Sequence, residues 1–367
     1  MIIKNVMVYT EDQRFIPGEI VIENGVFCTE ATNEDEVIDG EGCYAVPGLV
    51  DVHFHGAVGH DFCDGTEEAI QKIAEYEASE GITTIVPATM TLPESELLQV
   101  AKAAAAHKNG KGATLAGINM EGPFISPAKK GAQAATHIVS PDIAMFRRLQ
   151  DAANGLFRLV DIAPEEAGAM EFIKELKDEV HISFAHTTAD YETAKKGYEL
   201  GADHATHLYN AMPAFTHRAP GVIGAAHDCA NCMVELIADG VHIHPSVVRA
   251  TFDLFKDRVV LISDSMRATG MPDGEYTLGG QAVNVKGNRA TLVSDGALAG
   301  SVTNLMDCVR VVVKKMGIPL ETAIAAATIN PAKSVSLDDK YGSITPGKVG
   351  NVVLLDKELN LKKVIMN

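Results

Sequence analysis

The sequence predicts an α/β protein made of a (β/α)8 TIM-like barrel and a small β-sandwich domain built from both chain ends. Through the middle of the chain, apolar strand-like segments alternate with amphipathic helix-like segments, a pattern typical of a parallel sheet. Short β-like segments lie at the two ends instead. The 367 residues, 46% of them hydrophobic, exceed the ~250 typical of one barrel and leave room for an appended domain.

The β-like segments at the two ends are too small to bury separate cores, so we expect them to pair in one domain. The small β domain is expected to comprise residues 1–48 and 336–367, with the barrel at 49–335 between them. Its strands are expected at residues 2–8, 19–23, 26–28, 350–355 and 361–365.

The barrel segment holds eight strand-like runs, most of them followed by a helix-like run. The strands are expected at residues 45–52, 83–87, 115–120, 158–162, 182–185, 205–207, 234–237 and 259–263. The helices are expected at residues 67–79, 94–107, 142–153, 164–176, 190–200 and 245–255. A hairpin-like insertion follows at 276–292, and two further helices are expected at 303–316 and 319–327.

A doubly wound open sheet is the structural alternative. That fold usually has fewer strands and carries a glycine-rich phosphate-binding turn. Neither GxGxxG nor GxxxxGK[ST] occurs in this sequence. We therefore favour the barrel.

The chain is acidic. Its 31 Lys and Arg residues against 49 Asp and Glu residues give a net charge of −18, which argues against a nucleic-acid or anionic-lipid surface. Six cysteines are too few for a disulfide scaffold. No apolar run approaches the ~20 residues of a membrane helix, and the start lacks a signal peptide's pattern. We expect a cytoplasmic protein without nucleic-acid or membrane partners.

Polar side chains follow five of the expected barrel strands at the point where each strand ends. Catalytic groups of barrels come from these carboxyl-terminal strand ends, which meet at one mouth. We therefore expect four imidazoles and two carboxylates to converge there. These residues are His53, His55, Glu121, His186, His207 and Asp264.

This residue set predicts a catalytic metal site. His53 and His55 lie two residues apart, so both side chains point the same way in an extended chain. Imidazole and carboxylate ligands without thiolate suit a divalent ion: zinc first, with iron, manganese or cobalt as alternatives. The absence of a cysteine ligand argues against a closed structural zinc site.

Several motifs resemble those of the amidohydrolase superfamily, and within it the deacetylases of amino-sugar phosphates. The segment PGLVDVHFHG at residues 47–56 marks the wider superfamily. The resemblance covers essentially the whole chain. Its more specific motifs are MEGPF at 120–124, THLYNAM at 206–212, ADGVH at 238–242 and LAGS at 298–301.

The resemblance implies that Glu121, His186 and His207 hold the principal metal ion. Because the sequence also keeps His53 and His55, one or two ions per subunit are expected. A metal ion lowers the pKa of bound water to ~7 and polarises a carbonyl. Asp264, also counted among the metal ligands, would accept the proton of that water and pass it to the departing amine.

The implied reaction is hydrolysis of the acetamide of N-acetylglucosamine 6-phosphate to glucosamine 6-phosphate and acetate. The family's motifs place Arg218 and His242 on the phosphate, with Asn210 and the Ala211 amide assisting. In the family the arginine comes from the neighbouring subunit, which implies a homodimer. Ser301, in the LAGS motif, is a further expected substrate contact.

One position departs from the family pattern. Relatives often carry a histidine after the Lys-Lys-Gly loop, where this chain has Gln133. Glutamine can donate a hydrogen bond to substrate but cannot carry a proton, which argues against acid catalysis by this loop.

Three other functions remain open from the sequence. The first is the same reaction on the galactosamine epimer, and the second is hydrolysis of a cyclic amide. The third is a non-catalytic sugar-phosphate sensor, which would require a broken metal set. None of the expected ligands is missing here.

Overall fold

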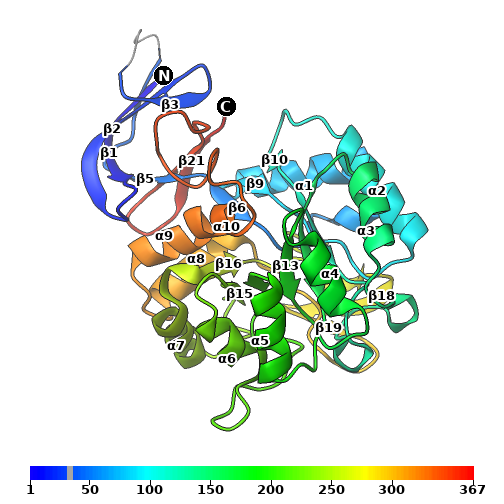
Figure 1. The fold of residues 1–367 in the computed structure, drawn as a ribbon. Coiled ribbons are helices and arrows are strands. Elements are labelled where there is room, and N and C mark those ends of the chain that lie inside the picture. The colour runs from blue at the N-terminus through cyan, green and yellow to red at the C-terminus, as the bar shows by residue number, and fades with distance from the viewer. Residues whose placement is uncertain (31–35) are drawn as a thin grey trace.

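The computed structural model describes residues 1–30 and 36–367. It contains a small β-rich part, in which both chain termini lie, and a larger α/β part built from the middle of the chain (Figure 1). Residues 31–35 belong to the segment expected to form the small domain and lie outside the described residues.

The small part is organised around one seven-stranded sheet that joins the two chain ends. Its order is β21-β20-β5-β1-β2-β3, with β4 also paired to β1. The antiparallel pairing of β20 with β5 brings Val353 opposite Val46, so strands from the two chain ends lie in one sheet. Its two-layer arrangement stays a prediction. The strands are β1 (Ile2–Tyr9), β2 (Phe15–Glu23), β3 (Val26–Cys28), β4 (Val37–Asp39), β5 (Tyr44–Pro47), β20 (Val352–Leu355) and β21 (Leu361–Ile365).

The larger part has a curled parallel sheet in two pieces, β10-β9-β6 and β11-β12-β13-β14-β15-β16. Backbone hydrogen bonds link the pieces on both sides: Asn119 N donates to Pro87 O, and Asp264 N donates to His53 O, each at 2.9 Å. The strands are β6 (Leu49–Asp51), β9 (Ile82–Ile85), β10 (Thr114–Leu115), β11 (Ile118–Glu121), β12 (Phe157–Ile162), β13 (His181–Phe184), β14 (His204–Ala205), β15 (Met233–Ile237) and β16 (Val259–Ile262).

Helices pack around this sheet through their apolar faces, and short polar residues cap several of them. Thr66, for example, accepts a hydrogen bond from Ala69 N at the start of α1. The helices are α1 (Glu67–Ser79), α2 (Glu94–Ala106), α3 (Ile143–Ala152), α4 (Ala169–Leu176), α5 (Tyr191–Leu200), α6 (Gly221–Asp228), α7 (Pro245–Phe255), α8 (Leu305–Lys314), α9 (Leu320–Ala327) and α10 (Ile329–Ser334).

Aromatic packing supports the helix layer. Phe172 on α4 contacts Phe124 and Phe146, with ring centroids 5.3 and 5.8 Å apart, and all three rings are fully buried. Edge-to-face ring pairs of this kind add stability beyond the apolar area they bury. This cluster lies in the main core of the larger part and is separate from the core of the small sheet.

Short elements complete the chain. The expected insertion at 276–292 is a three-stranded antiparallel sheet, of which the sequence analysis anticipated only a hairpin. The short strands are β7 (Gly56–Ala57), β8 (His60–Asp61), β17 (Gly274–Leu278), β18 (Gln281–Lys286) and β19 (Arg289–Leu292). The 3-10 helices are Phe62–Asp64, Pro127–Lys129, Ala135–His137 and Lys256–Arg258.

Several expected elements differ from the structure. The expected strand 115–120 is divided into β10 and β11, which lie in different pieces of the parallel sheet. The expected strand 45–52 is divided at Gly48, where a Cβ would lie 2.0 Å from Thr83 Oγ1, and its halves join different sheets. The expected helix 164–176 begins only at Ala169, because Gly168 has φ +93°. The strand expected at 205–207 ends at Ala205, since the chain turns at His207. Helices α6 and α10 were not predicted.

No helix within residues 1–30 and 36–367 combines the length and the apolar character that crossing a membrane requires.

Candidate active site

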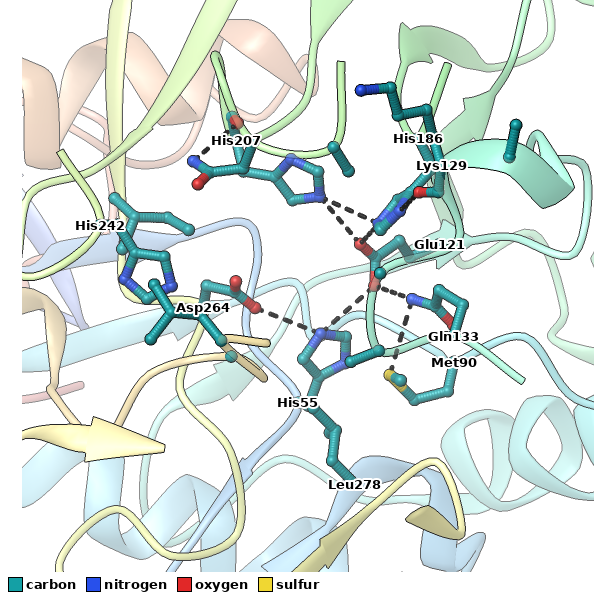
Figure 2. A pocket seen from close by; sticks show the side chains of 18 residues that line it. His55, Met90, Glu121, Lys129, Gln133, His186, His207, His242, Asp264 and Leu278 are labelled. Atoms are coloured by element: carbon teal, nitrogen blue, oxygen red, sulfur yellow. Dashed lines mark hydrogen bonds and ion pairs between the residues drawn. The ribbon is translucent and has the colours of Figure 1, made fainter. Parts of the chain in front are cut away.

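A cavity of about 370 Å³ opens where the parallel strands end, and most of the predicted site residues line it (Figure 2). Glu121 closes β11, and Asp264 follows β16 directly after Ser263. His186 and His207 follow β13 and β14 in the same way. The structure therefore brings most of the predicted side chains together at the strand ends. The predicted residues on the cavity wall are His55, Glu121, Gln133, His186, His207, Asn210, Ala211, His242 and Asp264.

Glu121, His186 and His207 form a tight triangle of ligand atoms. Glu121 Oε1 lies 3.0 Å from His186 Nε2 and 3.1 Å from His207 Nε2, and the two nitrogens are 3.2 Å apart. Tetrahedral zinc with ligand distances near 2.0–2.1 Å separates its ligands by about 3.3 Å. The three distances between ligand atoms therefore match those around a divalent metal ion, and these residues fit such an ion.

A contact outside the triangle orients His186. Its Nδ1 lies 2.8 Å from Lys129 O. A carbonyl oxygen only accepts, so Nδ1 must donate, and in the neutral imidazole Nε2 carries a lone pair toward Glu121. Metal-binding histidines commonly donate their other N–H to a carbonyl or carboxylate in this way.

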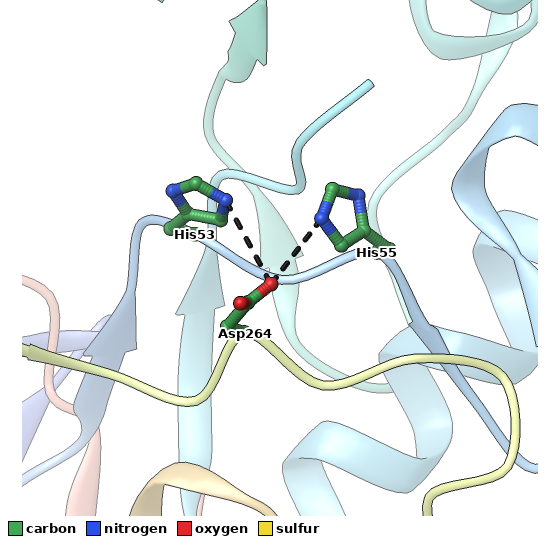
Figure 3. A group of neighbouring side chains, drawn as sticks. All are labelled: His53, His55 and Asp264. Carbon is green, nitrogen blue, oxygen red and sulfur yellow. Dashed lines mark ion pairs between the residues drawn. The ribbon is translucent and has the colours of Figure 1, made fainter. Parts of the chain in front are cut away.

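A second group consists of His53, His55 and Asp264 (Figure 3). Asp264 Oδ1 lies 3.3 Å from His55 Nε2 and 3.9 Å from His53 Nε2. His53 Nε2 is buried and has no hydrogen-bond partner among the described residues. His53 Nδ1 meets Glu235 Oε2 at 2.9 Å, which orients this ring as Lys129 orients His186. The second group can hold an ion of its own.

Backbone conformation turns three of these side chains into the cavity. His186, His207 and Asp264 have φ angles of +45°, +28° and +48°. Side-chain-bearing residues rarely adopt this left-handed conformation, and its cost concentrates at functional sites. Each of these residues lies two residues beyond the end of a strand, so the turn that ends the strand also redirects the side chain.

The two carboxylates make the site strongly attractive to positive charge. Burial lowers the pKa of His55, but its hydrogen bonds to Asp264 and Glu121 raise it to about 10. Burial raises the pKa of Glu121, whereas its contacts with His186 and His207 bring that pKa well below its ordinary value. The raised pKa of His55 and the lowered pKa of Glu121 both indicate that positive charge is favoured between these groups.

The predicted phosphate-binding residues are only partly assembled in this chain. His242 lines the cavity, and its Nδ1 contacts Asp239 Oδ2 at 2.8 Å. Asn210 Nδ2 donates to His207 O at 3.1 Å, which places its amide at the cavity edge next to Ala211. Arg218 is instead exposed and contacts His217 at 2.6 Å.

Ser301 and Gln133 make contacts that the sequence analysis did not anticipate. The Ser301 hydroxyl donates to Ser263 O at 2.6 Å, and its backbone N–H donates to Asp264 O at 2.7 Å. Ser301 thus braces the turn that carries Asp264. Gln133 lines the cavity but donates to Glu121 Oε2 at 2.7 Å.

Sequence reasoning missed the buried acids behind the ligands. Glu235 contacts His53 and accepts a hydrogen bond from His207 N at 3.1 Å, and Asp161 accepts one from Thr206 at 2.8 Å. A signal was present, because Glu235 interrupts an otherwise apolar strand and Asp161 stands within the buried end of β12. A buried carboxylate is costly without a partner, so such an interruption indicates a polar network.

The fold and the site define a hydrolase of the class that holds a divalent metal at the ends of parallel strands. The chain belongs to the amidohydrolase family, whose sequence model matches residues 44–367.

Its relatives specify the kind of hydrolase. The chain is 36% identical to N-acetylglucosamine-6-phosphate deacetylase of Bacillus subtilis (strain 168), with 98% of this chain and 93% of that protein covered. It is 34% identical to N-acetylgalactosamine-6-phosphate deacetylase of Escherichia coli O157:H7, covering 97% and 95%. A Mycobacterium smegmatis N-acetyl-D-glucosamine-6-phosphate deacetylase variant, solved with N-acetyl-D-glucosamine-6-phosphate, matches with a TM-score of 0.90 and 29% identity, covering 100% and 97%.

Proposed function

We propose that this chain hydrolyses the acetamide of N-acetylglucosamine 6-phosphate to glucosamine 6-phosphate and acetate. The observation that carries the proposal is the triangle of Glu121, His186 and His207, which opens into the same cavity as Asp264. The whole-length similarity to deacetylases of this substrate supports the substrate class.

Glu121, His186 and His207 would hold a divalent ion, which when bound would act as a Lewis acid, lowering the pKa of water to ~7 and polarising a carbonyl. Zinc fits the nitrogen and oxygen ligand set and the spacing of the triangle, and iron, manganese or cobalt can use the same ligands. His53, His55 and Asp264 are the proposed ligands of a second ion.

Asp264 is the proposed proton carrier. Burial raises the pKa of its carboxyl, but the hydrogen bond from His55 and the charge of His53 bring it below its ordinary value, so the group is ionised at neutral pH. It takes a proton from the attacking water and delivers it to the amide nitrogen. The water oxygen bonds to the carbonyl carbon and the C–N bond breaks. One water proton reaches the nitrogen through Asp264 and the second leaves the new carboxyl group for the amine, giving an ammonium group and acetate.

The phosphate is proposed to bind between His242, Asn210 and the Ala211 amide, completed by Arg218 of a second subunit. Arginine suits this role because its planar fork matches phosphate oxygens. The exposure of Arg218 outside its own cavity supports donation across a dimer interface. We further propose that Ser301 supports catalysis by holding the turn that carries Asp264. Gln133 can contact substrate only when its hydrogen bond to Glu121 is broken.

The finer architecture is also a proposal. We infer that residues 49–335 close into an eight-stranded barrel, supported by the backbone hydrogen bonds at both seams of the parallel sheet. Residues 1–48 and 336–367 are proposed to form the β-sandwich. A cytoplasmic location is supported by six free cysteines, which agree with a reducing compartment.

An acetate-release assay tests the function. We expect turnover of N-acetylglucosamine 6-phosphate and little turnover of the unphosphorylated sugar. Equal rates on both sugars would exclude the phosphate pocket, and activity only on dihydroorotate or a hydantoin would replace the proposal with a cyclic-amide hydrolase. The galactosamine epimer is a second candidate substrate, because the Escherichia coli relative carries that name. Turnover rates measured side by side on the two epimeric N-acetylated sugar phosphates decide which epimer is the substrate.

A further inference from the structure

Gln133 is held in one orientation by hydrogen bonds at both ends of its amide. The side chain is buried, its Oε1 accepts from Thr91 N at 2.7 Å, and its Nε2 donates to Glu121 Oε2 at 2.7 Å (Figure 2). The Thr91 N–H can only donate, so it must face the amide oxygen. The amide NH2 therefore has to face the carboxylate, and the flipped rotamer is excluded.

The anchor of this amide is itself rigid. Thr91 is buried and packs against Gly122, the residue directly after Glu121. A Cβ on Gly122 would lie 2.1 Å from Thr91 Oγ1, so the two segments approach as closely as glycine allows. Gln133 thus ties Glu121 to a buried point of the loop between β9 and α2.

The consequence is that the two oxygens of Glu121 have different surroundings. Oε1 faces His186 and His207 at 3.0 and 3.1 Å. Oε2 faces the Gln133 amide at 2.7 Å and His55 at 3.3 Å. A carboxylate oxygen that accepts an N–H bond has one lone pair fewer for a metal ion.

We propose that Gln133 is a positioning residue that makes the two metal sites unequal. It directs Glu121 Oε1 to the site of His186 and His207, and it occupies Oε2, which an ion at His53, His55 and Asp264 would otherwise share. The first site is therefore tight and the second weak. This inference rests on the proposed metal-dependent function, but it concerns ion binding without substrate.

Competitive chelator titrations of metal-depleted protein with Zn²⁺ test the proposal. We expect wild type to bind one ion tightly and a second more weakly. Gln133→Met, of similar size but without hydrogen bonds, should weaken the tight site about 10- to 100-fold, as loss of a contact that orients a ligand does. This substitution should also bring the dissociation constants of the two sites closer together. Gln133→Asn, too short to reach both partners, should behave in the same way.

Gln150→Met is the matched control. The Gln150 amide is likewise bonded at both ends, here to the backbone N and O of Phe157, both at 2.9 Å, and it lies outside the metal cluster. It should leave both dissociation constants and the Co²⁺ absorption spectrum unchanged, whereas the Gln133 variants alter that spectrum. Wild-type constants in Gln133→Met and Gln133→Asn would overturn the inference, as would equal affinities in wild type. Failure of wild type to bind any ion would instead reject the proposed function.

Discussion

The Nε2 atoms of His186 and His207 lie 3.2 Å apart, although the residues follow different strands, and Glu121 Oε1 faces both. His186 Nδ1 donates to a carbonyl, so its Nε2 lone pair points into this space. Two imidazole nitrogens at this distance repel each other unless a proton or a metal ion lies between them. The carboxylate oxygen completes a third ligand position, which makes a divalent ion the occupant that satisfies all three atoms.

Removal of the metal should abolish activity and preserve the fold. The ligands lie at the strand ends, whereas the hydrophobic clusters that hold the protein together contain none of them. After chelation we expect no acetate release, an unchanged far-UV circular dichroism spectrum, and a lower Tm because a bound ligand stabilises by mass action. Added zinc should restore activity. Unfolding on chelation would indicate a structural ion instead.

Asp264→Asn should lose turnover by several orders of magnitude and retain substrate binding. Asparagine is close in size but cannot accept and return a proton. Single-turnover acetate release measures the loss, and calorimetric titration with N-acetylglucosamine 6-phosphate measures binding. Ser301→Ala is a useful comparison, because it removes a contact beside Asp264 and keeps the carboxylate. A rate near that of wild type in Asp264→Asn would remove this residue from the mechanism.

Arg218→Ala should raise KM for the phosphorylated substrate at least ~10-fold with little change in kcat. A lost charge-assisted hydrogen bond to phosphate costs about 1.5–3 kcal/mol. Arg14→Ala is the control, since Arg14 is also exposed and forms its ion pair in the small domain. If the arginine acts across an interface, mixing Arg218→Ala with Asp264→Asn subunits should give heterodimers whose one working site regains the wild-type KM. An unchanged KM would exclude Arg218 from the phosphate site.

Phosphate binding should weaken as the pH rises through the pKa of His242. Burial lowers this pKa, but the hydrogen bond and the charge of Asp239 raise it above its ordinary value. The imidazolium that attracts phosphate is therefore fully present below about pH 6.5 and is lost above the raised pKa. We expect KM to increase over that alkaline range. Asp239→Asn, which keeps an acceptor for the backbone, should move the increase to lower pH; an unmoved profile would contradict the assignment.

Phe172→Ala should lower the free energy of unfolding by about 3–5 kcal/mol, the usual cost of emptying a buried aromatic site. The ring contacts Phe124 and Phe146 on the helix side of the sheet and touches no ligand residue. Denaturant unfolding measures the loss, and kcat should stay near wild type while the variant is folded. Val293→Ala, at a side chain 59% exposed, should change stability by about 0.5 kcal/mol or less.

Much of this protein could be predicted from local patterns. Helix α1 has the predicted bounds, because its apolar spacing, its Thr66 cap and its acidic first turn all agree. The convergence of the candidate metal ligands could be predicted because polar side chains at several strand ends share one mouth. Glu235 was missed although it interrupts an apolar strand, since nothing local shows that its partner is His53, 182 residues away.

The sequence by itself determined the alternation of strands and helices, the pairing of the chain ends and the chemical type of every expected ligand. The alternation and the ligand types follow from periodicity, capping and residue chemistry, which act over a few positions. The pairing of the chain ends was inferred because neither end is large enough to bury a core of its own. Only the tertiary structure decided that Glu121 presents Oε1 to two histidines and Oε2 to Gln133. That choice depends on side-chain rotamers and on how closely separate strand ends approach, and both are set by packing of the whole chain.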